Sequence, residues 1–305
     1  MWLYGGAERT SVRCNANKIE GQHPLPSLAS SWSLLSAFRY EQSDPDRFYR
    51  LLAEDTAALV QLYIPFEGKL ILEVGAGPGD LAEAIRRRGG RVLAVDSSWS
   101  EMHCRERLLA CAVQADGCKL PLAGDTCDLV CASNVLEHVP DPFAMAMEMI
   151  RVVKPGGIVF FNYTTWLSPF GGHETSPWHY LGGARAAKRY SRKYGHLPKN
   201  MYGESLFPMG VHRFKKRLDS GMVGATIIDA FPRYFPRWMK PVVSVPGLSE
   251  LLTLNLAVVI RKEGESVHQG YRREHGTTPS VGTEVHGGLK SLPAERSRSL
   301  ATGLE

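Results

Sequence analysis

The stretch that decides the fold runs from residue 70 to residue 80 and reads Leu70-Ile-Leu-Glu-Val-Gly-Ala-Gly-Pro-Gly-Asp80. Its apolar half is typical of a buried strand, and its three alternating glycines are typical of a tight turn that opens a helix. Glycine lets the main chain turn sharply and lets a ligand approach the bare backbone. The stretch therefore predicts a ligand-binding turn at the end of a strand in an α/β sheet.

The spacing of the glycines indicates which ligand the turn binds. Gly75, Gly77 and Gly79 give G-x-G-x-G, whereas the dinucleotide fingerprint is G-x-G-x-x-G and the P-loop ends in lysine. Glu73 stands two residues ahead of the first glycine, and a carboxylate suits a cationic ligand better than a pyrophosphate. These features point to S-adenosylmethionine, which carries a sulfonium and an ammonium. A nicotinamide dinucleotide is the less favoured alternative.

Strands and helices alternate on both sides of this stretch. Asp44-Pro45 starts an amphipathic helix that ends near Tyr63, because aspartate is a good N-cap and proline suits the first helical position. Continuous apolar strands between helices predict a parallel sheet covered on both faces. The expected strands are 69–74, 91–95, 112–115, 127–132 and 157–163, with two closing strands at 223–231 and 252–260; the expected helices are 79–88, 98–109 and 141–153, and 154–157 is an expected turn.

The same pattern predicts the domain organisation. Residues 1–30 lack sustained periodicity and are expected to be a disordered or weakly ordered extension. Residues 31–261 form the expected domain, with a helical cap at 31–63. Residues 164–212 are too long for a simple connection and are expected to form a lid or substrate insertion. Residues 262–305 contain few large apolar residues and are expected to be a disordered tail.

Acidic residues follow the next two expected strands. Asp96 ends the strand after the glycine turn, where a carboxylate can accept hydrogen bonds from ribose hydroxyls. Asp116 and Gly117 follow the third strand, where a carboxylate could accept the adenine amino group. The fourth strand ends in Ser133-Asn-Val-Leu-Glu-His138-Val. Ligands of a doubly wound sheet bind beyond these strand ends.

These motifs, taken in order, resemble class I S-adenosylmethionine-dependent methyltransferases of the type 11 branch. Sequences outside the motifs, such as Ser168-Pro-Phe-Gly-Gly-His-Glu174, resemble uncharacterised actinobacterial methyltransferases over about 35–262. The resemblance implies a Rossmann-like sheet of seven strands with an antiparallel last strand. It also implies the binding roles: Glu73, Gly75, Gly77 and Gly79 for the methionine part, Asp96 for the ribose, Asp116 and Gly117 for the adenine, and Ser133 near the methionine end.

The acceptor is less defined than the cofactor. The chain has Ser133-Asn-Val-Leu where methyltransferases of exocyclic amino groups commonly carry Asn/Asp-Pro-Pro-Tyr. Nucleic-acid amino methylation is therefore disfavoured, and transfer to oxygen or carbon is expected. Such acceptors can need a base, for which His138 and His173 are the candidates, with His179 and Glu174 also considered. A non-catalytic S-adenosylmethionine binder and an RNA methyltransferase are the alternatives.

Composition bears on partners and location. The chain is 44% hydrophobic and carries a net charge of +5, and no apolar run is long enough to span a membrane. It has no secretory signal pattern, so a cytoplasmic protein is expected. Six cysteines show no Cys-x-x-Cys or zinc-ligand spacing, and no metal site is predicted.

Positive charge is concentrated in one segment. Residues 185–199 contain six basic residues and no acidic one, and residues 231–240 interleave aromatics with cations. This composition is suited to an anionic membrane surface, with the inner face of the membrane as the expected place of contact. It favours a lipid-linked acceptor beside a small-molecule one.

Overall fold

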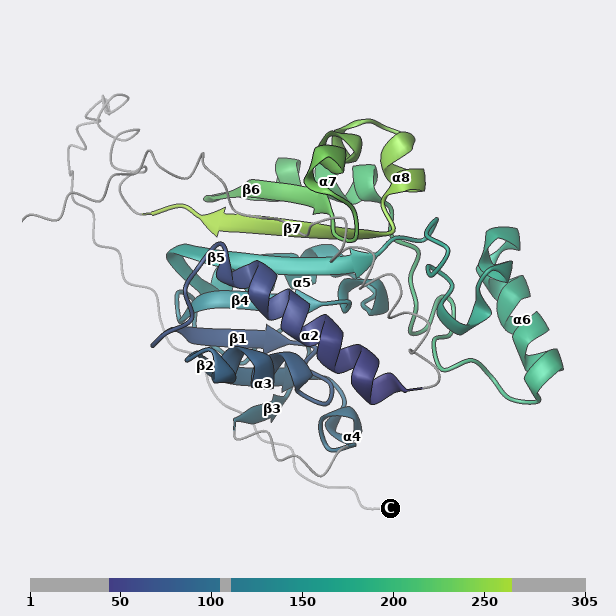
Figure 1. Ribbon diagram of the computed structural model, residues 1–305, viewed down its shortest axis with the longest axis horizontal. Helices are drawn as coiled ribbons and strands as arrows, with labels where there is room; N and C mark the ends of the chain where they lie inside the picture. The colour runs from purple at the N-terminus through teal and green to yellow at the C-terminus, as the bar shows by residue number, and fades with distance from the viewer. Residues whose placement is uncertain (1–43, 105–110, 265–305) are drawn as a thin grey trace, which may run out of the picture. The chain divides into compact units, whose positions relative to one another are not determined.

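The structure is a computed structural model that describes residues 44–104 and 111–264. In this part of the chain seven strands form one sheet in the order β3-β2-β1-β4-β5-β7-β6. Strands β1 to β5 pair in parallel, and β7 runs antiparallel to both of its neighbours (Figure 1). The predicted sheet with an antiparallel last strand is confirmed. The strands are β1 Leu70–Val74, β2 Arg91–Asp96, β3 Ala112–Gln114, β4 Cys127–Ser133, β5 Val153–Thr164, β6 Ala225–Pro232 and β7 Asn255–Lys262.

Helices connect and cover these strands. Two of them start as the sequence predicts: Asp44 caps the first helix by accepting from the backbone N–H of Arg47, and Asp141 accepts from the N–H groups of Phe143 and Ala144. In each case proline follows the cap. The α-helices are α2 Pro45–Gln61, α3 Asp80–Arg87, α4 Trp99–Met102, α5 Pro142–Val152, α6 Gly183–Tyr194, α7 Val211–Gly221 and α8 Leu248–Leu252. The 3-10 helices are η2 Leu136–His138, η3 His173–Thr175, η4 Trp178–Leu181 and η5 Arg237–Ser244.

Successive residues of the central strands point to opposite faces of the sheet and enter two separate cores. Ile71 and Phe160 pack on one face with residues of α2 and α3, including Leu81. Their neighbours Leu72 and Phe161 pack on the other face with residues of α5 and α7. Both faces of each central strand are therefore buried, which explains why the sequences of these strands are continuous apolar runs.

Several boundaries differ from the sequence prediction. The expected turn at 154–157 lies inside β5, which begins at Val153, and the pairing with β4 shifts register between Cys127 and Leu129. The glycines suit this irregular stretch, because Gly156 has φ +79° and a side chain on Gly157 would lie 2.8 Å from the Asp128 carbonyl oxygen. The second closing strand begins at Asn255, not at 252, because α8 occupies the preceding residues.

The long insertion follows β5 beyond the carboxyl ends of the parallel strands. It contains η3, η4 and α6, and Figure 1 shows α6 standing out past the tip of β5. The helix expected at 98–109 is shorter in the structure, where α4 ends at Met102 and His103 and Cys104 are not helical; residues 105–110 lie outside the described part. The predictions for residues 1–30 and for 265–305 lie outside it as well, as does the first part of the cap. No helix among the described residues has the length and hydropathy needed to cross a bilayer.

Candidate active site

The glycine turn after β1 has the backbone that the sequence predicts. Gly75, Gly77 and Gly79 all have positive φ, at +73°, +47° and +81°. A side chain on Gly75 would collide with Val135, which lies just past the end of β4. The turn therefore needs glycine for two reasons, a left-handed backbone and close packing against the β4 loop.

Asp96, at the end of β2, is bonded to that turn. One carboxylate oxygen accepts from the Gly77 N–H at 2.8 Å, and the other accepts from the Ser98 N–H at 2.8 Å. A carboxylate oxygen has two acceptor sites, so each retains one that a hydroxyl could occupy. Asp96 thus joins the glycine turn to the end of β2, at the position predicted for a ribose partner.

The loop after β3 lies against the end of β1. A side chain on Gly117 would lie 3.1 Å from a methyl group of Val74. Asp116 is exposed and accepts from the backbone N–H of Cys118 at 2.8 Å. The structure therefore places Asp116 and Gly117 at the same sheet edge as the glycine turn.

Glu73 is buried next to the turn, and the pKa of its carboxyl is strongly raised. Its side chain is 4% exposed, and burial raises the pKa of its carboxyl to about 8, with the negative charges of Asp80 and Asp96 adding to the rise. Its Oε2 atom has no hydrogen-bond partner. A buried carboxyl with an unpartnered oxygen beside two further acids fits a cationic ligand, because such a ligand would stabilise the ionised form.

Arg233 reaches the same edge from the far side of the sheet. It follows β6 and is 1% exposed. Its Nη2 donates to Asp55 at 3.1 Å and to Thr56 at 2.6 Å on α2, and its Nη1 lies 3.5 Å from the Ser133 hydroxyl. The Nε atom has no partner. Arg233 thereby links α2, β6 and the predicted methionine end of the site.

Three asparagines hold the loop that follows β4. Asn134 adopts φ +55°, a conformation that asparagine tolerates better than most residues. Its side-chain oxygen, Oδ1, accepts from the side-chain amides of Asn162 and Asn255, both at 2.7 Å. Asn162 and Asn255 are fully buried on β5 and β7. This network fixes the chain direction into η2.

Both predicted catalytic histidines meet at the end of that loop. His138, in η2, and His173, in η3, have ring centroids 5.0 Å apart with the rings nearly perpendicular. The Nδ1 atom of His138 lies 2.7 Å from the Ser205 carbonyl oxygen. Both side chains are half-buried. Two residues that stand far apart in sequence are thus neighbours at the carboxyl edge.

Glu137 completes this cluster. It is 1% exposed, its Oε1 accepts from the Thr164 N–H at 2.9 Å, and its Oε2 has no partner. Burial raises the pKa of its carboxyl, and the neighbouring His138 opposes that rise. One donor atom from each of Glu137, His138 and His173 lies within 4.8 Å of the others. The sequence pattern did not predict a site role for Glu137, although this residue stands next to His138.

His173 is held in place by an unusual backbone. Its φ is +49°, and a side chain on the preceding Gly172 would lie 2.5 Å from His179. The preceding glycines, Gly171 and Gly172, let this loop pack closely on itself. Burial lowers the pKa of His173 to about 4, and its Nδ1 has no partner.

The other two candidate bases have structural contacts. His179 is 1% exposed, with Nε2 3.2 Å from the Ser168 carbonyl oxygen and Nδ1 3.4 Å from the Ser176 hydroxyl. Glu174 accepts from the Asn200 side chain at 2.9 Å. These contacts hold the insertion together and do not bring either residue into the cluster.

The predicted contact surfaces are only partly exposed. In 231–240, Phe231, Arg233 and Tyr234 are buried, whereas Trp238 is 74% exposed. Residues 237–244 form the 3-10 helix η5, which contains Pro241. In 185–199 the basic side chains of α6 are exposed, with the Arg189 guanidinium 3.7 Å above the ring centre of Trp178.

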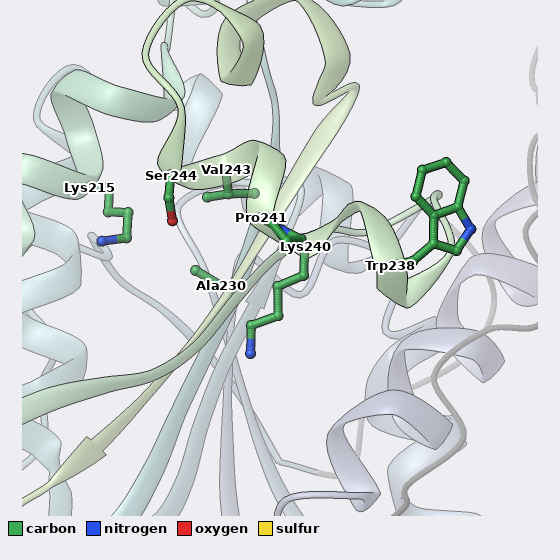
Figure 2. Close-up of a pocket in the computed structure, with 7 residues that line it drawn as sticks. All are labelled: Lys215, Ala230, Trp238, Lys240, Pro241, Val243 and Ser244. Carbon is green, nitrogen blue, oxygen red and sulfur yellow. The ribbon is translucent and has the colours of Figure 1, made fainter.

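A hollow of about 410 Å³ lies between α7, β6 and η5. Figure 2 shows Lys215 at one end and Trp238 at the other. None of the predicted cofactor-binding residues lines it. The lining residues are Lys215, Ala230, Trp238, Lys240, Pro241, Val243 and Ser244.

One family model and several known proteins are similar to this chain. Residues 72–161 match a family model described as a methyltransferase domain. An uncharacterized methyltransferase of Mycobacterium sp. (strain KMS) is 48% identical over 242 residues, covering 77% of this chain and 95% of that protein. One from Mycobacteroides abscessus is 44% identical over 248 residues, covering 77% and 94%. A crystal structure of an S-adenosylmethionine-dependent methyltransferase from Mesorhizobium loti is 21% identical, with a TM-score of 0.46, and covers 69% of this chain and 98% of that one.

Proposed function

The chain belongs to the S-adenosylmethionine-dependent methyltransferases, and we propose that it methylates an oxygen or a carbon of a small-molecule or lipid-linked acceptor. The proposal that the cofactor is S-adenosylmethionine is supported by one observation: the glycine turn, the buried Glu73 and Asp96 lie together. These residues fit S-adenosylmethionine on their own chemistry. The orphaned carboxyl oxygen of Glu73 suits a cation, and the glycines leave bare backbone for the ligand.

Residues of this chain would hold the cofactor as follows. Glu73 and the turn from Gly75 to Gly79 would contact the methionine part, Asp96 the ribose, and Asp116 with Gly117 the adenine. Ser133 would lie at the methionine end, beside the Arg233 guanidinium. S-adenosylmethionine supplies a methyl group on a sulfonium, which leaves as a neutral thioether.

The acceptor would meet this methyl group next to the β4 loop. Most of the acceleration of such an in-line transfer comes from holding the two reacting atoms in line. An acceptor hydroxyl or carbon acid would have to lose its proton as it takes the methyl group. His138 and His173 lie at the same edge and are the groups that we assign to receive that proton.

A lipid-linked acceptor and a membrane contact are favoured by the surface near η5 and α8. Trp238 is 74% exposed and Leu251 is 64% exposed. Exposed apolar side chains next to basic ones suit an anionic lipid interface. The basic side chains of α6 and of α7, among them Arg213 and Lys216, are exposed or partly exposed. We propose that these surfaces contact the inner face of the membrane.

The test of function is a labelling experiment with the full chain. Methyl-labelled S-adenosylmethionine and fractionated cell extract are combined, and label is measured in lipid, small metabolites, protein and RNA. Asp96→Ala should abolish labelling, and Asp219→Asn, an exposed change on α7, should leave it intact. Label confined to RNA would favour an RNA methyltransferase. Cofactor binding without label in any fraction would favour a non-catalytic binder.

The membrane contact has its own test. Sedimentation with anionic vesicles should be weakened in a Trp238→Ser/Leu251→Ser variant. Val223→Ser is the matched control, because Val223 is 87% exposed but precedes β6 at the opposite end of the strand. Equal sedimentation of both variants, or no sedimentation of the parent chain, would contradict this part of the proposal.

A further inference from the structure

The cluster of Glu137, His138 and His173 leaves donor atoms unused in a buried setting. Glu137 Oε2 and His173 Nδ1 are both buried and lack any hydrogen-bond partner. Buried polar atoms in native proteins are nearly always bonded, so each exception calls for a partner. Two such atoms from separate segments converge here, together with His138.

Each side chain of the cluster is oriented by a backbone group on its other side. His138 Nδ1 lies 2.7 Å from the Ser205 carbonyl oxygen, so Nδ1 carries the proton and Nε2 presents its lone pair. Glu137 Oε1 is held by the Thr164 N–H, so Oε2 is left to bind something else. Metal-ligating side chains are typically oriented by hydrogen bonds of this kind.

We propose that Glu137 Oε2, His138 Nε2 and His173 Nδ1 bind one divalent transition-metal ion. Two imidazoles and one carboxylate favour zinc, iron or manganese over magnesium or calcium, which prefer oxygen ligands alone. One possible ligand atom of each of the three residues lies within 4.8 Å of the other two. Ligands of a tetrahedral zinc ion are about 3.4 Å apart, so the widest pair would close by about 1.4 Å on binding.

The sequence predicted no metal because the ligand pattern is not local. Glu137 and His138 are adjacent, but the third ligand comes from η3, on the far side of β5 in sequence. The positive φ of His173 turns its ring toward η2 within a loop whose glycines permit tight packing. The site therefore exists only in the folded chain.

The role of the ion rests on the proposed function, whereas its binding does not. On that function, an oxygen of the acceptor would occupy an open position of the ion. A hydroxyl bound to the ion would lose its proton to solvent more readily, because the ion lowers its pKa. With the ion bound, His138 and His173 would be its ligands in place of the proton acceptors proposed above, and the acceptor would be an oxygen compound.

The test measures metal binding directly, without cofactor. Full-length protein free of any purification tag is stripped with chelator and titrated with Co²⁺, and visible d–d absorption is recorded. We expect one Co²⁺ per chain. Glu137→Gln keeps the acceptor for Thr164, and His173→Asn suits a positive φ. Each should weaken Co²⁺ binding by more than about 100-fold, because loss of an outer-shell partner alone costs about 10–100-fold.

Matched control variants distinguish loss of the metal site from the effect of removing any histidine and from misfolding. His196→Gln and His212→Gln change exposed histidines elsewhere and should bind Co²⁺ as the parent chain does. Far-ultraviolet circular dichroism and cofactor binding report whether each variant is folded. Absence of Co²⁺ binding by the parent chain, or unchanged binding in folded Glu137→Gln and His173→Asn, would overturn the proposal. Metal binding without methyl transfer would overturn the proposed function alone.

Discussion

The proposed cofactor side and the proposed acceptor side of the carboxyl edge, hereafter the cofactor side and the acceptor side, are built in different ways. On the cofactor side, Gly75 follows β1, Asp96 ends β2 and Asp116 lies two residues past β3, and these consecutive strands lie side by side. On the acceptor side, His138 meets His173, and Ser133 meets Arg233 across 100 residues of sequence. Position along the chain therefore predicts contacts on the first side and fails to predict them on the second.

The largest expected effect is on Arg233, which joins the two sides. Arg233→Met should lower the free energy of unfolding by about 3 kcal/mol, because it leaves the Asp55 charge without its buried partner. Urea denaturation followed by circular dichroism measures this. Arg217→Met is the control, since Arg217 is exposed, and it should change stability by about 0.5 kcal/mol or less. A small loss for Arg233→Met would mean that the two sides are independent.

The next prediction tests the packing of the glycine turn. Gly75→Ala should lower cofactor affinity about 30-fold, because the added methyl group collides with Val135 and the backbone is left-handed. Isothermal titration calorimetry measures the affinity. The double variant Gly75→Ala/Val135→Ala, in which the Val135 side chain is shortened, should regain part of the lost cofactor affinity. Gly68→Ala is the control, with φ +69° and no steric neighbour, and it should bind cofactor normally.

A third prediction concerns pH and the cofactor side alone. The pKa of Glu73 is about 8 in the free protein, so its carboxyl is mostly protonated at pH 7. A cationic ligand favours the ionised form, so cofactor affinity should rise about tenfold from pH 6 to pH 8 and then level off. In calorimetry, Glu73→Gln should remove this pH dependence. A parent-like slope in that variant would assign it to another group.

The same shift affects stability with the opposite trend. The raised pKa means that the folded free protein binds a proton more tightly than the unfolded chain, whose carboxyl has its ordinary pKa of 4.5. The stabilising contribution of protonated Glu73 is full below about pH 4.5 and is lost as pH rises through about 8. Glu73→Gln should flatten this part of the stability profile.

The smallest expected effect is on the insertion surface. Arg189→Ala removes the stacking of a guanidinium on Trp178 and should cost about 0.5–1 kcal/mol in thermal or urea unfolding. Arg185→Ala, on the same exposed helix, should cost less. Cofactor affinity should stay unchanged in both variants. A change in affinity would show that the acceptor side and the cofactor side are coupled through the insertion.

Local patterns predicted the sheet, the starts of α2 and α5, and the glycine turn. They succeed where the chemistry needs only neighbouring residues, as with Asp44 before Pro45 or three glycines in five positions. They failed at 154–157, because a proline and two glycines that usually make a turn lie inside β5 next to its register shift. They also missed Arg233, because its exposure depends on α2, far away in sequence.

The amino-acid order was enough to predict the fold and the family and to point to S-adenosylmethionine as the cofactor, because a parallel sheet brings the ends of successive strands to one edge whatever follows them. It did not reveal the asparagine network, the buried arginine or the Glu137–His138–His173 cluster. Those groups form only where the insertion and the β6–β7 segment fold back against that edge. Long-range packing determines where these segments lie. The order of the strands places the residues of the proposed cofactor site, whereas long-range packing places those of the proposed acceptor site.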